Sequence, residues 1–529
     1  MTVEWLFGNG PIWTGTSDVE ALAIAGDRVV TAGTEDEARA AVGPDARSVD
    51  LDGHRLVPGL IDSHVHFLRA GMHWNDVVRW DDIGSLQEGL ARIEQAAAAT
   101  PQGTWIRVLG GWHPHRLEER RGPTTAELDA AAPDHPVFVQ LLYEEASLNS
   151  AAVAAALGEG DPPGGTIERH PDGLPTGTIR GPGAFAAVLG SVPQPAVEAQ
   201  HSSFAALMAE CSRLGLTGVI DPGGFGVTPP SYDGLLDVWE SGGLDVRVRL
   251  YLVPWERGSE VEQVRYWVEN IEPGSGDDWL RYVGVGEIFT FGCHDMEGLN
   301  EFAVSDEART DLAEITTLLA RSGWPGHLHA ILDSTIDTVL DVWEEVAAEV
   351  GALPRFSLTH ADFISGRNLQ RAADLGIGIG TQSRFLFRAA DSAASWGRTA
   401  TAAAPPLRDI LDLGIPLGAG TDGTVVTPIN PWLTLWWLIT GQSLDEAPPR
   451  DERHRLSRHE ALAAYTSGSA WFSLEEQERG TLAPGMLADL AVLNEDFFAV
   501  AESAIPELRS VLTMVGGRVV HADGPFDGV

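Results

Sequence analysis

Eight short, nearly continuous apolar segments recur along the middle of the chain, and longer helical stretches separate them. Apolar runs of this kind are typical of parallel strands that are buried on both faces. Eight such strands alternating with helices predict an α/β fold, a (β/α)8 or TIM barrel. The predicted strands are 56–67, 217–225, 246–253, 282–291, 326–332, 355–363, 376–382 and 415–425.

A long segment, 68–200, separates the first two predicted strands and is rich in Gly, Pro and Trp. Because it is far longer than an ordinary strand-to-helix connection, we expect a lid or inserted subdomain there. The barrel with this insert is predicted to span 57–479.

Short strands and tight turns occupy both ends of the chain. Segments 5–7 and 11–13 flank Gly8-Asn9-Gly10, and segments 21–25 and 28–32 flank Gly26-Asp27, which predicts two hairpins. Segments 487–493, 510–515 and 518–521 have the same character. We therefore expect 1–56 and 480–529 to form one composite β-sandwich domain.

The charge of the chain is strongly unbalanced. It holds 35 basic and 76 acidic residues, a net charge of −41, and no lysine. A polyanion of this kind repels nucleic acid and anionic membranes, so the expected partner is a small-molecule substrate. GC-rich coding and a high-salt cytoplasm both produce such a composition, and we favour the first.

Only two cysteines, Cys211 and Cys293, are present, too few for a disulfide framework. The first ten residues lack the basic and apolar pattern of a signal peptide, and no apolar stretch reaches the ~18 residues of a membrane span. We expect a cytoplasmic protein, and a homodimer as the common default.

Polar side chains stand where the predicted barrel strands end, which is where barrel enzymes build their sites. Two histidines one residue apart on the first strand point in the same direction. Imidazole and carboxylate donors together suit a divalent metal, zinc first, with manganese or iron as alternatives. The candidate ligands are His64, His66, Glu287, His329, His360 and Asp422.

Each of these residues has an ordinary structural explanation when taken alone. A strand histidine such as His360 is more often a core residue, and Asp422-Gly423 is also turn chemistry. Buried together without a metal, however, the group would leave polar atoms unpaired at a cost of about several kcal/mol each. A metal site is therefore favoured.

Candidate substrate-binding residues are Trp112, His113, Arg180, Phe291 and Gln382. Trp112 and His113 belong to a polar and aromatic loop in the insert, and Gln382 ends the seventh predicted strand. Two alternatives remain open: Trp112 only packs the insert, and Arg180 forms a surface ion pair.

The motifs 57–66, 328–330, 358–360, 420–422 and 480–485 occur in an order that resembles the amidohydrolase superfamily. The closest resemblance is to its YtcJ-like branch, amidohydrolase family 3, which includes N-substituted formamide deformylases. The resemblance implies that His64, His66 and Asp422 hold one metal and that His329 and His360 hold another.

Many relatives bridge their two metals with a carbamylated lysine, but this chain has Glu287 at the matching position and no lysine. A glutamate bridges two cations without modification, so we favour two metals. In the alternative, Glu287 orders a histidine around a single ion.

The resemblance implies a metal-dependent amidohydrolase that cleaves an amide or related C–N bond of a small hydrophobic or aromatic substrate. A metal-activated hydroxide would attack the substrate, and Asp422 would carry the proton. Alternatives are an ester or lactone hydrolase, a deaminase or a non-hydrolytic lyase on the same site, and a catalytically silent binding protein.

Overall fold

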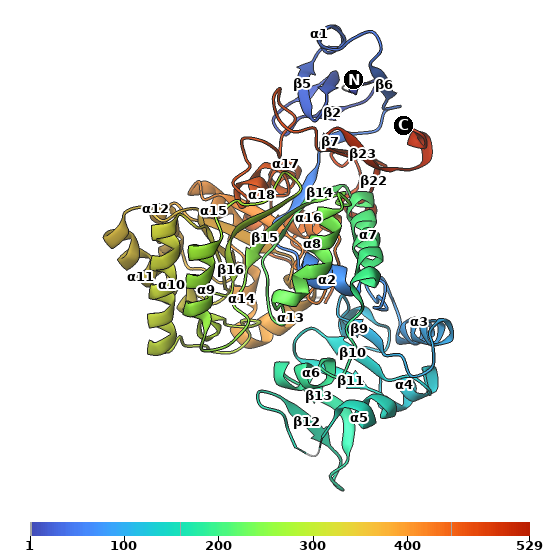
Figure 1. Ribbon diagram of the computed structural model, residues 1–529, viewed down its shortest axis with the longest axis vertical. Helices are drawn as coiled ribbons and strands as arrows, with labels where there is room; N and C mark the ends of the chain where they lie inside the picture. The colour runs from blue at the N-terminus through green and yellow to red at the C-terminus, as the bar shows by residue number, and fades with distance from the viewer. Residues whose placement is uncertain (1–2, 159, 446) are drawn as a thin grey trace.

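The computed structural model describes residues 3–158, 160–445 and 447–529. The chain is elongated, as Figure 1 shows: strands from both termini lie at one end, the barrel lies in the middle, and the insert lies at the other end.

Eight parallel strands form the central sheet, and their order in the sheet follows the sequence. The sheet closes between its first and last strands, because the amide of Ser63 donates to the carbonyl of Ala419 (3.0 Å) and that of Asp422 to His64 (2.8 Å). The predicted α/β barrel is confirmed. Its strands are β8 (Leu60–Asp62), β14 (Leu216–Asp221), β15 (Arg247–Leu252), β16 (Leu280–Glu287), β17 (Gly326–Ala330), β18 (Phe356–His360), β19 (Gly378–Gln382) and β20 (Leu417–Gly420).

Helices cover the outside of this barrel and bury one apolar face against it. In α11, Ile336, Val339, Leu340 and Trp343 recur at helical spacing and are fully buried. The helices around the barrel are α2 (Phe67–His73), α7 (Val197–Arg213), α8 (Asp233–Glu240), α9 (Glu260–Asn270), α10 (Asp306–Ser322), α11 (Asp333–Val350), α12 (Gly366–Leu375), α13 (Phe385–Trp396), α14 (Arg398–Ala402), α15 (Leu407–Asp412), α16 (Pro431–Thr440), α17 (Arg458–Ala464) and α18 (Ser467–Trp471).

Two sheets pack face to face at the ends of the chain, one with strands from both ends and one with N-terminal strands alone. Side chains such as Trp5, Leu22, Leu490 and Leu512 fill the space between them. One sheet has the order β23 (Arg518–Ala522), β22 (Ser510–Val515), β21 (Leu490–Leu493), β7 (Leu56–Pro58), β2 (Ile12–Trp13) and β3 (Asp18–Val19). The other has the order β5 (Arg28–Gly33), β4 (Ala21–Ala25), β1 (Glu4–Gly8) and β6 (Arg47–Asp50), and α1 (Glu35–Ala41) lies against it.

Two local predictions are wrong. The apolar run 56–67 is two strands, because β7 pairs in the terminal sheet while β8 enters the barrel, so the predicted boundary at 57 falls inside β7. Gly59 lies between them, where a Cβ would lie 2.3 Å from the Thr217 side chain. Segments 5–7 and 11–13 form no hairpin, since β1 pairs with β4 and β6 whereas β2 pairs with β3 and β7. The hairpin at Gly26-Asp27 is present as β4 and β5.

The insert between β8 and β14 has a mixed sheet of its own, with helices on it. The sheet order is β12 (Thr166–Arg169), β13 (Pro175–Arg180), β11 (Glu145–Leu148), β10 (Val137–Leu141) and β9 (Ile106–Leu109). Its helices are α3 (Leu86–Ala99), α4 (Thr125–Ala131), α5 (Ser150–Ala156) and α6 (Pro182–Leu189). Among the described residues, no helix has the length and apolar character that crossing a membrane requires.

Candidate metal centre

The carboxylate of Glu287 lies among four histidines at the C-terminal mouth of the barrel. Its Oε2 is 3.5 Å from Nε2 of His64, 3.5 Å from Nδ1 of His329 and 3.9 Å from Nε2 of His360. Its Oε1 is 3.8 Å from Nε2 of His66. All five side chains are buried, so four different strand ends contribute to one enclosed polar cluster.

Asp422 completes this cluster from the loop after β20. Its Oδ1 lies 3.1 Å from Nε2 of His66 and 3.7 Å from Nε2 of His64. Asp422 has φ 59° and His360 has φ 68°, the left-handed region that most residues avoid. Such backbone is typical of functional sites, where surrounding structure imposes it. The six predicted ligands therefore lie together.

The donors of this cluster fit a divalent metal. Among the described residues, Nε2 of His64 and Nδ1 of His329 are buried without a hydrogen-bond partner, and each lies 3.5 Å from Oε2 of Glu287. Two ligand atoms that each lie ~2.1 Å from one tetrahedral ion are roughly 3.4 Å apart. The separations of 3.1 to 3.9 Å between histidine nitrogens and carboxylate oxygens match that spacing.

Neighbouring groups fix the orientation of the first two histidines. Nδ1 of His66 lies 2.8 Å from the carbonyl of Gly223, so it donates there and leaves Nε2 facing the cluster. Nδ1 of His64 lies 3.2 Å from Nε2 of His327 and 3.1 Å from Oγ1 of Thr359. His327 thus lies directly behind His64, on the side away from Glu287.

Two residues beside the cluster, His294 and Asp295, were not predicted. The ring of His294 stacks on that of His329, with centroids 3.7 Å apart. His294 also forms a possible ligand group with Glu287 and His329, and Asp295 pairs with His329. Both follow the fourth barrel strand by a short loop, so a search extended past the strand end would have found them.

Charge interactions within the cluster keep Glu287 and His329 charged although both side chains are buried. Burial opposes ionisation of Glu287, but the histidines around it hold its pKa well below its usual range. Burial also opposes protonation of His329, yet Asp295 and Glu287 raise its pKa to about 10. A metal must therefore displace a proton to bind there.

Two predicted substrate residues lie near the cluster without lining it. Gln382 is fully buried, and its Oε1 accepts a hydrogen bond from the amide of His360 at 2.9 Å, so it positions a predicted ligand. Phe291 packs against Phe225 with ring centroids 5.9 Å apart, and Phe225 lines the pocket at the cluster.

The other three predicted substrate residues lie away from the cluster. Trp112 is buried in the core of the insert and donates to the carbonyl of Gln140 at 2.9 Å. His113 packs near Phe387 of α13. Arg180 is half exposed and pairs with Glu145 and Glu168. Trp112 therefore packs the insert, and Arg180 forms a surface ion pair. These are the alternatives considered for the two residues above.

A cavity of about 670 Å³ adjoins the cluster between barrel and insert. It shares Arg69, Tyr143, Phe225 and Met296 with the pocket that holds the candidate ligands. Arg69 donates to Oη of Tyr143 at 2.9 Å and to the carbonyl of Phe225 at 3.2 Å. Neither Arg69 nor Tyr143 was predicted, because Arg69 lies on α2 and Tyr143 in the turn between β10 and β11, and neither segment carries a motif.

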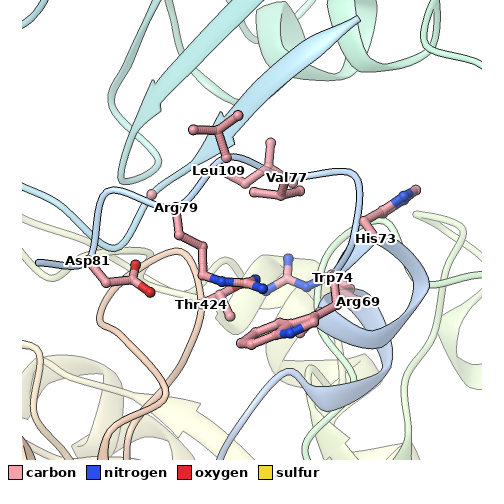
Figure 2. A pocket seen from close by; sticks show the side chains of 11 residues that line it. Arg69, His73, Trp74, Val77, Arg79, Asp81, Leu109 and Thr424 are labelled. Atoms are coloured by element: carbon pink, nitrogen blue, oxygen red, sulfur yellow. The ribbon is translucent and has the colours of Figure 1, made fainter. Parts of the chain in front are cut away.

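The insert also contacts the loop that carries Asp422. Figure 2 shows Leu109 of the insert, Arg69 of α2 and Thr424 of this loop around one small pocket, with Arg79 over the ring of Trp74. Next to Leu109, the amide of Gly111 donates to the carbonyl of Val425 at 3.1 Å.

Comparison with known proteins shows which family the chain belongs to. The chain is 28% identical to N-substituted formamide deformylase of Arthrobacter pascens, over 95% of this chain and 94% of that protein. It is 26% identical to the putative amidohydrolase YtcJ of Bacillus subtilis (strain 168), over 90% and 91%. An uncharacterized metal-dependent hydrolase from Pyrococcus horikoshii OT3 shares the fold, with a TM-score of 0.72 and 22% identity over 94% of this chain and 99% of that one. The model of the amidohydrolase family matches residues 47–521. The predicted resemblance is confirmed, and the chain belongs to the amidohydrolase family.

Proposed function

We propose that this chain hydrolyses an amide or related C–N bond of a small, largely apolar substrate. The observation that carries the proposal is the carboxylate of Glu287 within 4 Å of four histidine side chains, with Asp422 beside them. Membership of the amidohydrolase family and the likeness to a formamide deformylase support it.

The ligand set supports zinc, with manganese or iron as substitutes, because imidazole nitrogens and carboxylate oxygens are the donors these ions share. His64, His66 and Asp422 would hold one ion, His329 and His360 another, and Glu287 would lie between them. A bound metal of this kind lowers the pKa of water to ~7 and polarises a carbonyl group.

Asp422 is the proposed proton carrier. An amine leaves an amide only after its nitrogen gains a proton. A carboxylate beside the attacking water can take a proton from that water and deliver it to the leaving nitrogen. Asp422 lines the pocket and Oδ1 lies 3.1 Å from a predicted ligand nitrogen.

The adjoining cavity supports a small organic substrate. Met72, Leu109, Phe185, Leu189 and Phe225 give it apolar walls, and the volume of about 670 Å³ suits a drug-sized molecule rather than a polymer. The insert supplies Leu109, Phe185 and Leu189, so the shape of this cavity depends on where the insert docks.

Metal analysis combined with a panel of N-substituted formamides and N-acyl amines tests the proposal. We expect bound metal and turnover of at least one C–N substrate, both lost in Glu287→Gln and retained in the exposed Glu307→Gln. Bound metal with turnover of esters or lactones alone would contradict amide hydrolysis. A protein that takes up no metal from metal-supplemented medium would contradict the metal site itself.

A further inference from the structure

Arg107 lies on the face of strand β9 that looks into the large cavity. Side chains alternate across a strand, so Ile106 and Val108 enter the core of the insert while Arg107 and Leu109 line the cavity. Only 5% of Arg107 is exposed.

Among the described residues, the guanidinium of Arg107 forms no ion pair. Burial lowers its pKa, and the charge of Asp76 nearby offsets this only in part. Eight arginines are buried in the described part of the chain, and six of them pair with a carboxylate. A seventh, Arg450, donates to two backbone carbonyls. Within the described residues, Nε of Arg107 has no hydrogen-bond partner, and its guanidinium has one side-chain hydrogen bond, 3.4 Å to Nδ1 of His73. Because a buried charge without a partner is costly, the cavity favours an occupant that brings negative charge.

The position of Arg107 relative to the metal centre sets the geometry of that occupant. Helix α2 begins directly after His66 and carries Arg69 and, one turn later, His73, beside which Arg107 lies. Figure 2 shows Arg69 and His73 together on this helix. At 1.5 Å per residue, His73 lies ~10 Å along the helix from the candidate ligand His66.

We propose that the substrate carries a carboxylate remote from its scissile C–N bond and that Arg107 binds this carboxylate. The inference rests on the proposed function. It narrows the substrate class to amides that carry a free carboxylate at the far end of an alkyl chain. A span of ~10 Å corresponds to on the order of eight covalent bonds. The apolar walls at Met72, Leu109 and Phe185 then contact the chain between the two ends.

Matched substrates test this inference. N-Formyl ω-amino acids of two to ten carbons are compared with N-formyl alkylamines of equal length. We expect kcat/KM of the best acid to exceed that of its neutral counterpart at least about tenfold, because charge-assisted hydrogen bonds to arginine are strong. Arg107→Met should raise KM for the acid and remove the preference, and Arg107→Lys should keep part of it. The exposed Arg121→Met is the matched control.

Equal kcat/KM for acid and neutral substrates in the wild type, or an equal loss for both in Arg107→Met, would overturn the inference. Calorimetric binding of octanoate separates it from the proposed function. If octanoate binds and Arg107→Met abolishes the binding while no amide is hydrolysed, only the proposed function fails. If neutral formamides are hydrolysed but acids are neither preferred nor bound, only the inference fails.

Discussion

Nε2 of His329 lies 3.0 Å from Oδ1 of Asp295. The second oxygen, Oδ2, accepts hydrogen bonds from the amides of Ile331 (3.0 Å) and Leu332 (2.9 Å), which directly follow β17. Asp295 therefore joins the loop after β16 to the end of β17. Through this contact it turns Nδ1 of His329 toward Glu287.

Removing this support should weaken the metal site without removing a predicted ligand. Asp295→Ala should lower metal affinity ~10- to 100-fold, the usual effect of losing a carboxylate behind a ligating histidine. Competition with a chelator measures the affinity. Asp295→Asn keeps an oxygen that accepts from the backbone amides, so its metal affinity should lie between that of the wild type and that of Asp295→Ala. An unchanged affinity in Asp295→Ala would show that His329 needs no such support.

Asp422→Asn should separate catalysis from metal binding. The amide cannot carry the proton, so kcat should fall ~10²- to 10⁴-fold, while the fold and most of the metal remain. Steady-state kinetics and metal content measure the two effects. The exposed Asp412→Asn serves as control. Activity near that of the wild type would assign the proton carrier elsewhere.

Asp81 makes the stability of the protein depend on pH. Burial raises its pKa from 3.8 to about 7, although Arg79 and Arg116 lie nearby. Between these values the unfolded chain loses the proton and the folded chain keeps it, so stability declines as pH rises from about 4 to 7 and levels off above.

Asp81→Asn should remove this decline, because the amide stays neutral. Its gain in the free energy of unfolding over the wild type should be absent near pH 4 and rise toward its full value above pH 7, up to roughly 4 kcal/mol for a shift of this size. Thermal denaturation across pH measures it. Asp82→Asn should show the opposite trend, since a hydrogen bond from Arg92 lowers the pKa of Asp82. A gain that does not change with pH in Asp81→Asn would contradict the raised pKa of Asp81.

Gly110 sets the contact between the insert and the loop that carries Asp422. It has φ 103°, and a Cβ there would lie 2.2 Å from the backbone oxygen of Val425. Gly103 has φ 83° but nothing within 4 Å of its Cβ position. Gly103→Ala should lower the free energy of unfolding by ~1–2 kcal/mol, the cost of a left-handed backbone at a residue with a Cβ. Gly110→Ala should lower it further and should also lower kcat. Chemical denaturation and kinetics on both variants test this; equal effects would exclude the contact.

Residue patterns were sufficient to predict the barrel and to expect that the six candidate ligands lie together at its mouth. Both strand faces are buried, so the strands appear as apolar runs, and the parallel strands bring residues such as Glu287 and His360 to one rim. The terminal strands were harder to predict. Whether Gly8-Asn9-Gly10 closes a hairpin or redirects the chain between two sheets depends on distant partners such as β4 and β7.

Residues that depend on the docking of the insert could not be predicted. Arg107 lies on β9 and Tyr143 in the turn between β10 and β11, and both reach the cavity because the insert packs over α2. The same packing directs Trp112 into the core of the insert rather than toward the metal cluster. The spacing of residues in the sequence does not reveal how the insert docks on the barrel.

Anomalous scattering at the zinc edge from crystals grown with zinc tests the central claim most directly. The account predicts two peaks enclosed by His64, His66, Glu287, His329, His360 and Asp422, with Glu287 between them. It would be contradicted by a map without a peak in this cluster, or by Glu287, His329 or His360 turned away from the others.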